Sequence, residues 1–152
     1  MKQYTDIFLD LDNTLYDTKC LLEPRPVEGA LELLRYLRDK GYRLHLCSNG
    51  SREGRLRKLR AIGIEDYFLT IITSQEAETD KPDPWFFEYA LMLTEAKAAT
   101  TLMIGDNYDT DIVGAEAMGI DTLLFNRWER DWMPPGPVTY RVNELKEIMQ
   151  II

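Results

Sequence analysis

Short runs of apolar residues recur along this chain, and each is followed by a longer segment in which apolar residues repeat every three or four positions. The short runs are typical of buried strands of a parallel sheet, because both faces of such a strand are covered. The longer segments are typical of amphipathic helices. The pattern predicts five strands, at residues 7–9, 44–47, 69–72, 101–104 and 122–125.

The predicted helices are bounded by residues that favour helix ends. Pro26 suits a first helical position, Ser51 suits an N-terminal cap, and Gly41, Gly63 and Gly119 suit the ends of helices. Five helices are predicted, at residues 26–40, 51–62, 84–93, 109–118 and 142–151. Strands that alternate with helices build a parallel sheet with helices on both faces. We therefore expect one domain over residues 1–152, of class α/β, with a doubly wound, three-layer, Rossmann-like parallel sheet.

Polar segments whose side chains could bind a ligand or take part in a reaction follow the predicted strands. They are Asp10-Leu11-Asp12-Asn13-Thr14, Ser48-Asn49-Gly50, Lys81-Pro82, and Gly105-Asp106 with Asp111. In open α/β sheets, ligands bind beyond the carboxyl ends of the strands. A random scatter of polar residues would not follow that rule, so the segments predict a single site.

The acids of this site require a cation. Asp10, Asp12 and Asp106 would bring several negative charges together, and at ~4 Å like charges repel by several kcal/mol at a protein-like dielectric constant. Oxygen-only ligands favour Mg²⁺, which commonly binds a few carboxylates and a substrate phosphate. Lys81 would add a compact positive charge, and Ser48 with the two amides after it would suit phosphate oxygens.

In this order, the four segments resemble the four motifs of the haloacid dehalogenase (HAD) superfamily, and the similarity runs from Ile7 to about Phe125. The resemblance implies that Asp10 is the nucleophile that takes the phosphoryl group. It implies that Asp12 protonates the leaving oxygen and then activates water. Phosphate binding is implied for Thr14, Ser48, Asn49, Gly50 and the catalytic Lys81. Mg²⁺ binding is implied for Asp10, the carbonyl of Asp12, Asp106 and Asp111.

The segment between the first motif and Ser48 is short for this superfamily. The sequences around Asp12 and Lys81 look like the branch of nucleotide and sugar-phosphate phosphatases, whose members usually insert a helical cap there. Here only residues 15–26 precede the first predicted helix, so we expect no cap domain and an open site. The branch favours a small phosphorylated metabolite as the substrate, whereas an open site favours a phosphoprotein.

Two other classes of protein remain open. A response-regulator receiver is also doubly wound, with an acid cluster and a Lys-Pro pair, but there the pair comes late, whereas here Lys81-Pro82 precedes Asp106. A long-lived phosphorylated form would favour a receiver, and rapid hydrolysis a phosphatase. A binding protein on the same fold would show no Mg²⁺-dependent turnover.

Composition narrows the range of partners. The chain has 18 Lys and Arg against 26 Asp and Glu, a net charge of −8, which argues against nucleic acid or an anionic membrane as the main partner. No apolar stretch reaches the length of a membrane span, the N-terminal residues do not resemble a signal peptide, and Cys20 and Cys47 make no disulfide framework. A cytoplasmic location is therefore expected, and an exposed cleft is compatible with a homodimer.

Three groups beside the motifs have a structural and a functional interpretation. The second predicted helix is basic, so Arg52 or Arg55 could meet an anionic substrate, although a solvated face is the commoner role of such a helix. Trp128 and Trp132 follow the fifth strand on the side of the site, where they could stack on a substrate or pack over the edge of the core. His45 lies within a strand and is expected to be structural.

Overall fold

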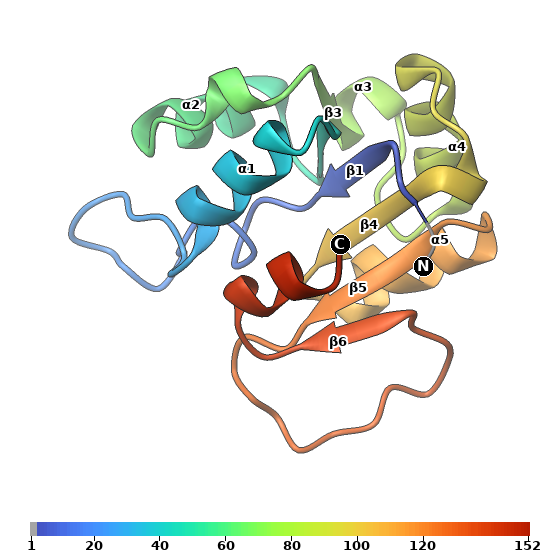
Figure 1. Cartoon of the computed structure of the whole chain (residues 1–152). Coiled ribbons are helices and arrows are strands. Elements are labelled where there is room, and N and C mark those ends of the chain that lie inside the picture. The colour runs from blue at the N-terminus through green and yellow to red at the C-terminus, as the bar shows by residue number, and fades with distance from the viewer. Residues whose placement is uncertain (1–2) are drawn as a thin grey trace.

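A six-stranded parallel sheet forms the centre of the computed structural model, which describes residues 3–152. The strands are β1 (Asp6–Leu9), β2 (Arg43–Ser48), β3 (Thr70–Thr73), β4 (Thr101–Gly105), β5 (Asp121–Phe125) and β6 (Tyr140–Val142). Their order is β3-β2-β1-β4-β5-β6, and every pair is parallel (Figure 1). The winding reverses between β1 and β4, which is where such sheets bind ligands.

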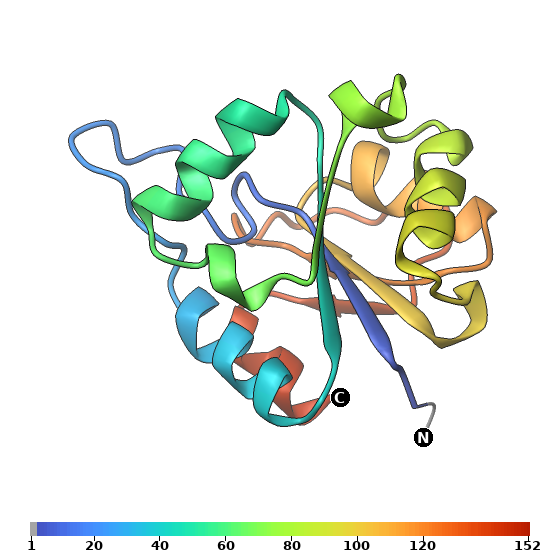
Figure 2. The same ribbon diagram turned by 90° about the horizontal axis from the view of Figure 1, so that it is seen from above.

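Helices cover both faces of this sheet. They are α1 (Ala30–Asp39), α2 (Arg52–Ala61), α3 (Ser74–Ala77), α4 (Pro84–Thr94) and α5 (Val113–Ala117), with 3-10 turns at Glu65–Tyr67, Ala98–Thr100 and Leu145–Gln150. In β1, Ile7 and Leu9 share a core with α1 and the last 3-10 helix, whereas Phe8 shares a core with α4 and α5. Figure 2 shows these helices on opposite sides of the sheet. The predicted doubly wound, three-layer fold is confirmed.

All five predicted strands are confirmed, but the prediction of a helix from residue 142 is wrong at its start. Tyr140–Val142 is β6, which pairs in parallel with β5, and the 3-10 helix Leu145–Gln150 follows it. The strand is short and comes directly after a stretch rich in proline and glycine. Its hydrogen-bonding partner is distant in sequence, so the local pattern does not reveal it.

Two helices begin differently from the prediction. Pro26 is not helical, because it forms an antiparallel bridge with Tyr16, and α1 begins at Ala30, after Gly29 with a φ of 87°. Proline lacks a donor for a sheet ladder, but it can take part in an isolated bridge at a sheet edge or turn. The helix predicted at residues 109–118 is present, but its first turn, Tyr108–Ile112, is a wider π-helical turn that leads into α5.

Between β1 and α1 the chain forms a loop and not a cap domain. The Tyr16–Pro26 bridge closes the base of this loop. At its tip the side chains of Leu21 and Leu22 are 91% and 98% exposed. The loop projects from the body of the molecule at the left of Figure 1. The site at the end of β1 therefore has no internal domain over it.

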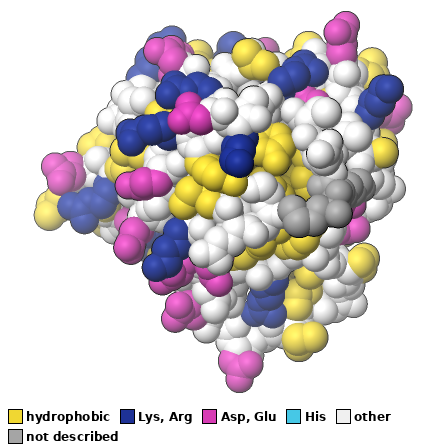
Figure 3. Space-filling view, in the orientation of Figure 1, with side chains coloured by type: hydrophobic (Ala, Val, Ile, Leu, Met, Phe, Trp, Pro, Cys, Tyr) yellow, Lys and Arg dark blue, Asp and Glu magenta, His cyan; other side chains and the backbone are white. Residues whose placement is uncertain are grey.

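The surface carries charges of both signs. On the face drawn in Figure 3, Lys and Arg side chains are interspersed with Asp and Glu, and hydrophobic side chains gather near the centre. Within residues 3–152, no helix has both the length and the apolar character needed to cross a bilayer.

Candidate active site

The carboxyl ends of β1, β2 and β4 meet around a hollow of about 200 Å³. It is lined by Asp10, Asp12, Asn13, Ser48, Asn49, Lys81, Asp106, Asn107 and Thr110. Each of the four polar segments contributes at least one of these residues. The sheet topology thus brings together side chains that are far apart in the sequence.

Lys81 lies at the centre of the site. Its side chain is buried, and Nζ donates hydrogen bonds to Asp10 Oδ1 (2.9 Å), Asp111 Oδ1 (2.6 Å) and the carbonyl oxygen of Cys47 (2.8 Å). Burial alone would lower the pKa of Lys81, but the charges of Asp10 and Asp111 outweigh it and raise the pKa above its ordinary value. The ammonium group is therefore charged, and all three of its protons are engaged.

Three carboxylates gather here, and Lys81 pairs with two of them, Asp10 and Asp111. Oxygen atoms of Asp10, Asp106 and Asp111 lie within 4.8 Å of one another. Burial, together with the charges of Asp10 and Asp111, raises the pKa of Asp106 to about 8. Burial and the charge of Asp10 also raise the pKa of Asp111. The cluster thus holds more carboxylates than Lys81 can neutralise, and the raised pKa values are the result.

An oxygen-only set of donors with surplus negative charge fits Mg²⁺. Asp10 and Asp106 line the hollow, whereas Asp111 does not. The two oxygens of Asp111 already accept hydrogen bonds, one from Lys81 and one from a backbone amide (3.1 Å). Asp10 and Asp106 are therefore the best placed of the predicted carboxylate ligands, and ligation by the carbonyl of Asp12 stays a prediction.

The carboxylate of Asp12 lies apart from this cluster and contacts two cations of α2. Asp12 Oδ2 accepts a hydrogen bond from Arg55 Nη1 (3.0 Å), and Oδ1 accepts one from Lys58 Nζ (2.7 Å). The side chains of Arg55 and Lys58 are only 13% and 29% exposed, so this part of the basic helix is not a solvated face. Sequence reasoning missed Lys58. The available signal was the spacing of three residues, which places both cations on one face of the helix.

Three of the five residues predicted to bind phosphate line the hollow: Lys81, described above, Ser48 and Asn49. Ser48 ends β2, and Asn49 follows it. The Asn49 side chain is held by two hydrogen bonds with the backbone of Lys81, one in each direction (2.8 and 3.1 Å). Asn107 and Thr110, from the turn before α5, complete the lining on the side of Asp106. These side chains leave polar atoms at the mouth for an anion.

The other two predicted phosphate ligands do not line the hollow. Thr14 is fully buried, and its hydroxyl donates to Asp106 Oδ1 (3.2 Å). The amide of Gly50 donates to Ser74 Oγ (2.8 Å). The donors of Thr14 and Gly50 are therefore engaged within the protein, and phosphate binding by these two residues stays a prediction.

The turn that carries Asp12 is also held from the side of β5. Asn13 has a φ of 62°, in the left-handed region that asparagine tolerates. Its Oδ1 accepts hydrogen bonds from Arg127 Nη1 (2.8 Å) and from Thr18 Oγ1 (2.9 Å). Arg127 also forms an ion pair with Asp17 (3.0 Å). The segment after β5 thus fixes the first motif, a role that the sequence did not predict for Arg127.

The two tryptophans after β5 contact neighbouring side chains and do not line the hollow. The guanidinium of Arg127 lies over the ring of Trp128, 4.3 Å from its centre. Trp132 meets the ring of Tyr108 edge to face, with 5.8 Å between the ring centres. Both indoles keep an exposed part. These contacts agree with the packing interpretation.

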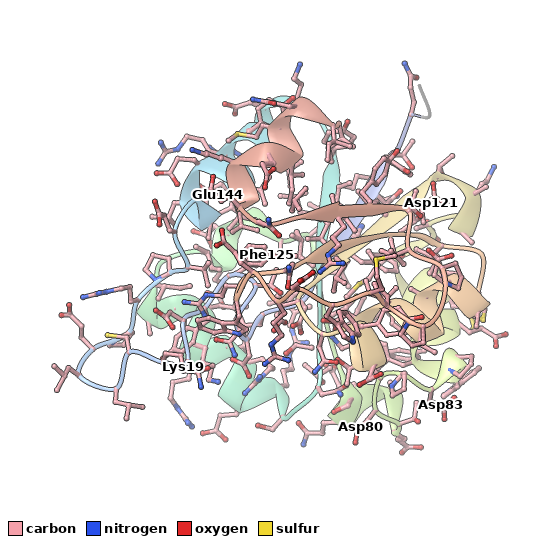
Figure 4. The ribbon with its side chains drawn as sticks, turned by 90° about the horizontal axis from the view of Figure 1, so that it is seen from below. Lys19, Asp80, Asp83, Asp121, Phe125 and Glu144 are labelled. Atoms are coloured by element: carbon pink, nitrogen blue, oxygen red, sulfur yellow. The ribbon has the colours of Figure 1, made fainter. Side chains whose placement is uncertain are left out.

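A larger hollow of about 460 Å³ lies between the start of α1 and the last 3-10 helix. Phe125 and Glu144, both labelled in Figure 4, are part of its lining, together with Arg127. None of the residues of the four polar segments lines it. Catalysis needs convergent groups with shifted pKa values, and those lie in the smaller hollow, which is therefore the candidate active site.

The family model of the haloacid dehalogenase-like hydrolases matches residues 21–125. Over 73% of its length the chain is 32% identical to a ribulose-1,5-bisphosphate 5-phosphatase of Halopiger xanaduensis, covering 46% of that protein. Over 82% of its length it is 33% identical to a glyceraldehyde 3-phosphate phosphatase of Methanothermobacter thermautotrophicus, covering 59% of that protein. The chain thus spans about half the length of these curated relatives.

Solved structures share the fold. The HAD-hydrolase YfnB of Bacillus subtilis, bound to magnesium, superposes with a TM-score of 0.90 at 19% identity, over 99% of both chains. A HAD phosphatase of Thermococcus onnurineus superposes with a TM-score of 0.85 at 20% identity, over 99% of this chain and 97% of that one. At these identities the likeness establishes the architecture around the hollow.

Proposed function

The chain belongs to the haloacid dehalogenase-like hydrolase family, and we propose that it is a Mg²⁺-dependent phosphomonoester hydrolase that acts through an aspartyl-phosphate on Asp10. The observation that carries the proposal is the cluster of Asp10, Asp106, Asp111 and the buried Lys81 at the carboxyl ends of the strands. A nucleophilic carboxylate beside a charged ammonium group and surplus acids suits phosphoryl transfer, in which catalysis is mostly positioning and electrostatic stabilisation.

In the first step, an oxygen of the Asp10 carboxylate attacks phosphorus. The bond from phosphorus to the ester oxygen breaks, and its electron pair stays on that oxygen, which takes a proton from the Asp12 carboxyl group. Lys81, already hydrogen-bonded to Asp10, holds the nucleophile in place, and Ser48 and Asn49 face the phosphate oxygens. Splitting one difficult displacement into two easier ones is the advantage of this covalent route.

In the second step, water attacks the phosphorus of the aspartyl-phosphate. The carboxylate of Asp12 takes a proton from the water, and the bond between phosphorus and the Asp10 oxygen breaks. Inorganic phosphate leaves, Asp10 is a carboxylate again, and Asp12 is again protonated. A Mg²⁺ ion held by Asp10 and Asp106, with the carbonyl of Asp12 and with Asp111 beside it, would neutralise negative charge on the transferred phosphoryl group.

For the substrate, we favour a small phosphorylated metabolite. The curated relatives named above act on phosphorylated sugars, and the hollow of about 200 Å³ has the size of a phosphate with a small organic group. The missing cap favours the alternative, a phosphoprotein, or a second copy of the chain that covers the mouth.

Two free cysteines, Cys20 and Cys47, support a reducing compartment such as the cytoplasm.

The test is phosphate release from para-nitrophenyl phosphate, with Mg²⁺ and with chelator, by the wild type and by Asp10→Asn. We expect turnover that needs both the metal and Asp10. Asp109→Asn is the matched control, because Asp109 is an exposed acid in the turn after Asp106 and should leave turnover unchanged. Substantial activity of Asp10→Asn would contradict the aspartyl-phosphate route. Sugar phosphates and phosphopeptides, tested next, decide between the two substrate classes.

A further inference from the structure

The two cations on Asp12 are the feature of the site that the four motifs do not explain. Arg55 and Lys58 each bind a different oxygen of the same carboxylate, at 3.0 and 2.7 Å. Two charge-assisted bonds to the two oxygens fix both the position and the plane of a carboxylate. The Asp12 side chain is otherwise 37% exposed at the mouth of an open site.

The cations are themselves held in place. Arg55 Nη1 also donates to Ser48 Oγ (3.3 Å), and its side chain packs over Gly50, where a Cβ atom would lie 3.0 Å from Arg55 Nε. The ammonium group of Lys58 lies 5.0 Å from the ring centre of Tyr16. By contrast, Arg57 on the same helix is 72% exposed and pairs only with its neighbour Glu53. Helix α2 thus presents two fixed cations, Arg55 and Lys58, to the site, whereas Arg57 faces solvent.

We propose that Arg55 and Lys58 are positioning residues that hold the carboxyl group of Asp12 in line with the leaving oxygen of the substrate. The inference rests on the proposed function, because it concerns the proton that Asp12 gives to that oxygen. Proton transfer needs the donor and acceptor atoms within hydrogen-bond reach, about 2.6–3.2 Å. Within residues 3–152 no domain lies over the loop that carries Asp12, and the two contacts that orient its carboxyl group come from α2.

If Arg55 and Lys58 position Asp12, the effect of losing them on the reaction rate should depend on the leaving group of the substrate. When the leaving group is an alkyl alcohol, its oxygen must receive a proton as the bond to phosphorus breaks, so the placement of Asp12 governs the rate. A nitrophenolate leaves as a stable anion and needs no proton. Loss of the positioning contacts should therefore slow formation of the aspartyl-phosphate much more from an alkyl phosphate than from an aryl phosphate.

The experiment compares kcat/KM for glycerol phosphate and for para-nitrophenyl phosphate in Lys58→Met, Arg55→Gln and the control Arg57→Gln, because kcat/KM covers only the steps up to the aspartyl-phosphate and excludes the later attack of water, in which Asp12 also takes part. For Lys58→Met we expect kcat/KM on glycerol phosphate to fall about 10-fold or more, with kcat/KM on the aryl phosphate nearly unchanged. Lys58→Arg should restore the rate. Arg55→Gln should show the same preference, with an added rise in KM because Arg55 also contacts Ser48. Arg57→Gln should match the wild type.

An equal fall for both substrates, or no fall, would overturn the inference. A second measurement does not depend on turnover: urea unfolding of Asp12→Asn, Lys58→Met and the double variant. Effects that are clearly non-additive support the contact, and additive effects overturn it. If the wild type hydrolyses neither phosphate, the proposed function fails, and the unfolding cycle still decides whether Lys58 holds Asp12.

Discussion

Two polar clusters, each with a buried carboxylate, lie at opposite ends of the same strands, and they differ in the balance of their charges. At the amino ends, Asp6 of β1 accepts hydrogen bonds from His45 Nε2 (2.8 Å) and Thr5 Oγ1 (2.7 Å), and it pairs with Arg43 (3.3 Å). Both carboxylate oxygens of Asp6 have partners, and the positive charge of Arg43 balances the negative charge of this carboxylate. At the carboxyl ends, oxygens of Asp10, Asp106 and Asp111 gather, and the single ammonium group of Lys81 pairs with two of these carboxylates, Asp10 and Asp111.

The difference separates a structural cluster from a functional one. His45 is fully buried, and burial lowers its pKa more than Asp6 raises it, so the ring acts as a neutral hydrogen-bonding group, as expected of a structural histidine. The cluster around Lys81 keeps a surplus of acid that costs stability, and the raised pKa of Asp106 reports that cost. Native proteins commonly retain such an imbalance where a ligand or a reaction uses it.

The largest expected effects come from a matched pair of substitutions, Asp10→Asn and Asp6→Asn. Asp10→Asn should lower kcat by at least about 10³-fold and leave the free energy of unfolding nearly unchanged, because the cluster has acid to spare. Asp6→Asn should lower the free energy of unfolding by about 1–3 kcal/mol, because it disturbs the hydrogen bonds of a buried carboxylate with His45 and Thr5, and leave kcat per folded molecule unchanged. Urea unfolding and steady-state kinetics of both variants test this. Similar results for the two variants would remove the distinction between the clusters.

Mg²⁺ should raise the free energy of unfolding by binding to the cluster around Lys81, which has surplus carboxylates, and not to the cluster around Asp6. A ligand that binds the folded state alone, at 100 times its dissociation constant, raises the free energy of unfolding by about 2.7 kcal/mol. We expect a gain of this order for the wild type and for Asp6→Asn, and most of it should be lost in Asp106→Asn. Thermal unfolding with a Mg²⁺ titration measures it. A full gain in Asp106→Asn would mean that the ion binds elsewhere.

The pH dependence of stability should have opposite signs at the two clusters. The folded-state pKa of Asp106, about 8, lies above its unfolded value, so the folded state binds one more proton than the unfolded state between about pH 4 and pH 8. The free energy of unfolding therefore falls as pH rises through this range, by up to about 1.4 kcal/mol per pH unit. The lowered pKa of His45 has the opposite effect. The contribution of His45 to stability is present above about pH 6.5 and is lost as pH falls through its folded-state pKa.

Urea unfolding in chelator at several pH values, for the wild type and Asp106→Asn, isolates the first of these effects. The difference between the two curves should shrink to nothing below about pH 4. A pH-independent difference would contradict the raised pKa of Asp106.

Local signals were enough to predict most of the fold and the centre of the site. The apolar runs located five strands, and the order of the motifs placed Asp10, Ser48, Lys81 and Asp106 at one edge of the sheet, where the structure has them. Local signals failed at Tyr140–Val142, a strand whose pairing comes from β5. They also failed at Pro26, where a bridge to Tyr16 outweighs the preference of proline for the start of a helix.

The contacts that orient the first motif could not be predicted in the same way. Arg55 and Lys58 lie 43 and 46 residues from Asp12, and Arg127 lies 114 residues from Asn13. A basic helix and an arginine after a strand are common on any surface. Only the folded chain brings these cations to the site, whereas the acids of the motifs are recognised by their spacing alone.

The loop between β1 and α1, which is closed at its base, affects how such proteins can evolve. The Tyr16–Pro26 bridge and the hydrogen bond from the Asp17 amide to the Arg25 carbonyl (2.9 Å) hold the two ends of the loop side by side. The span between these ends does not depend on the length of the chain joining them, so a folded insert with neighbouring termini fits there without disturbing the sheet. A single genetic insertion or deletion can thus add or remove a lid, exchanging access for selectivity while the chemistry below stays intact.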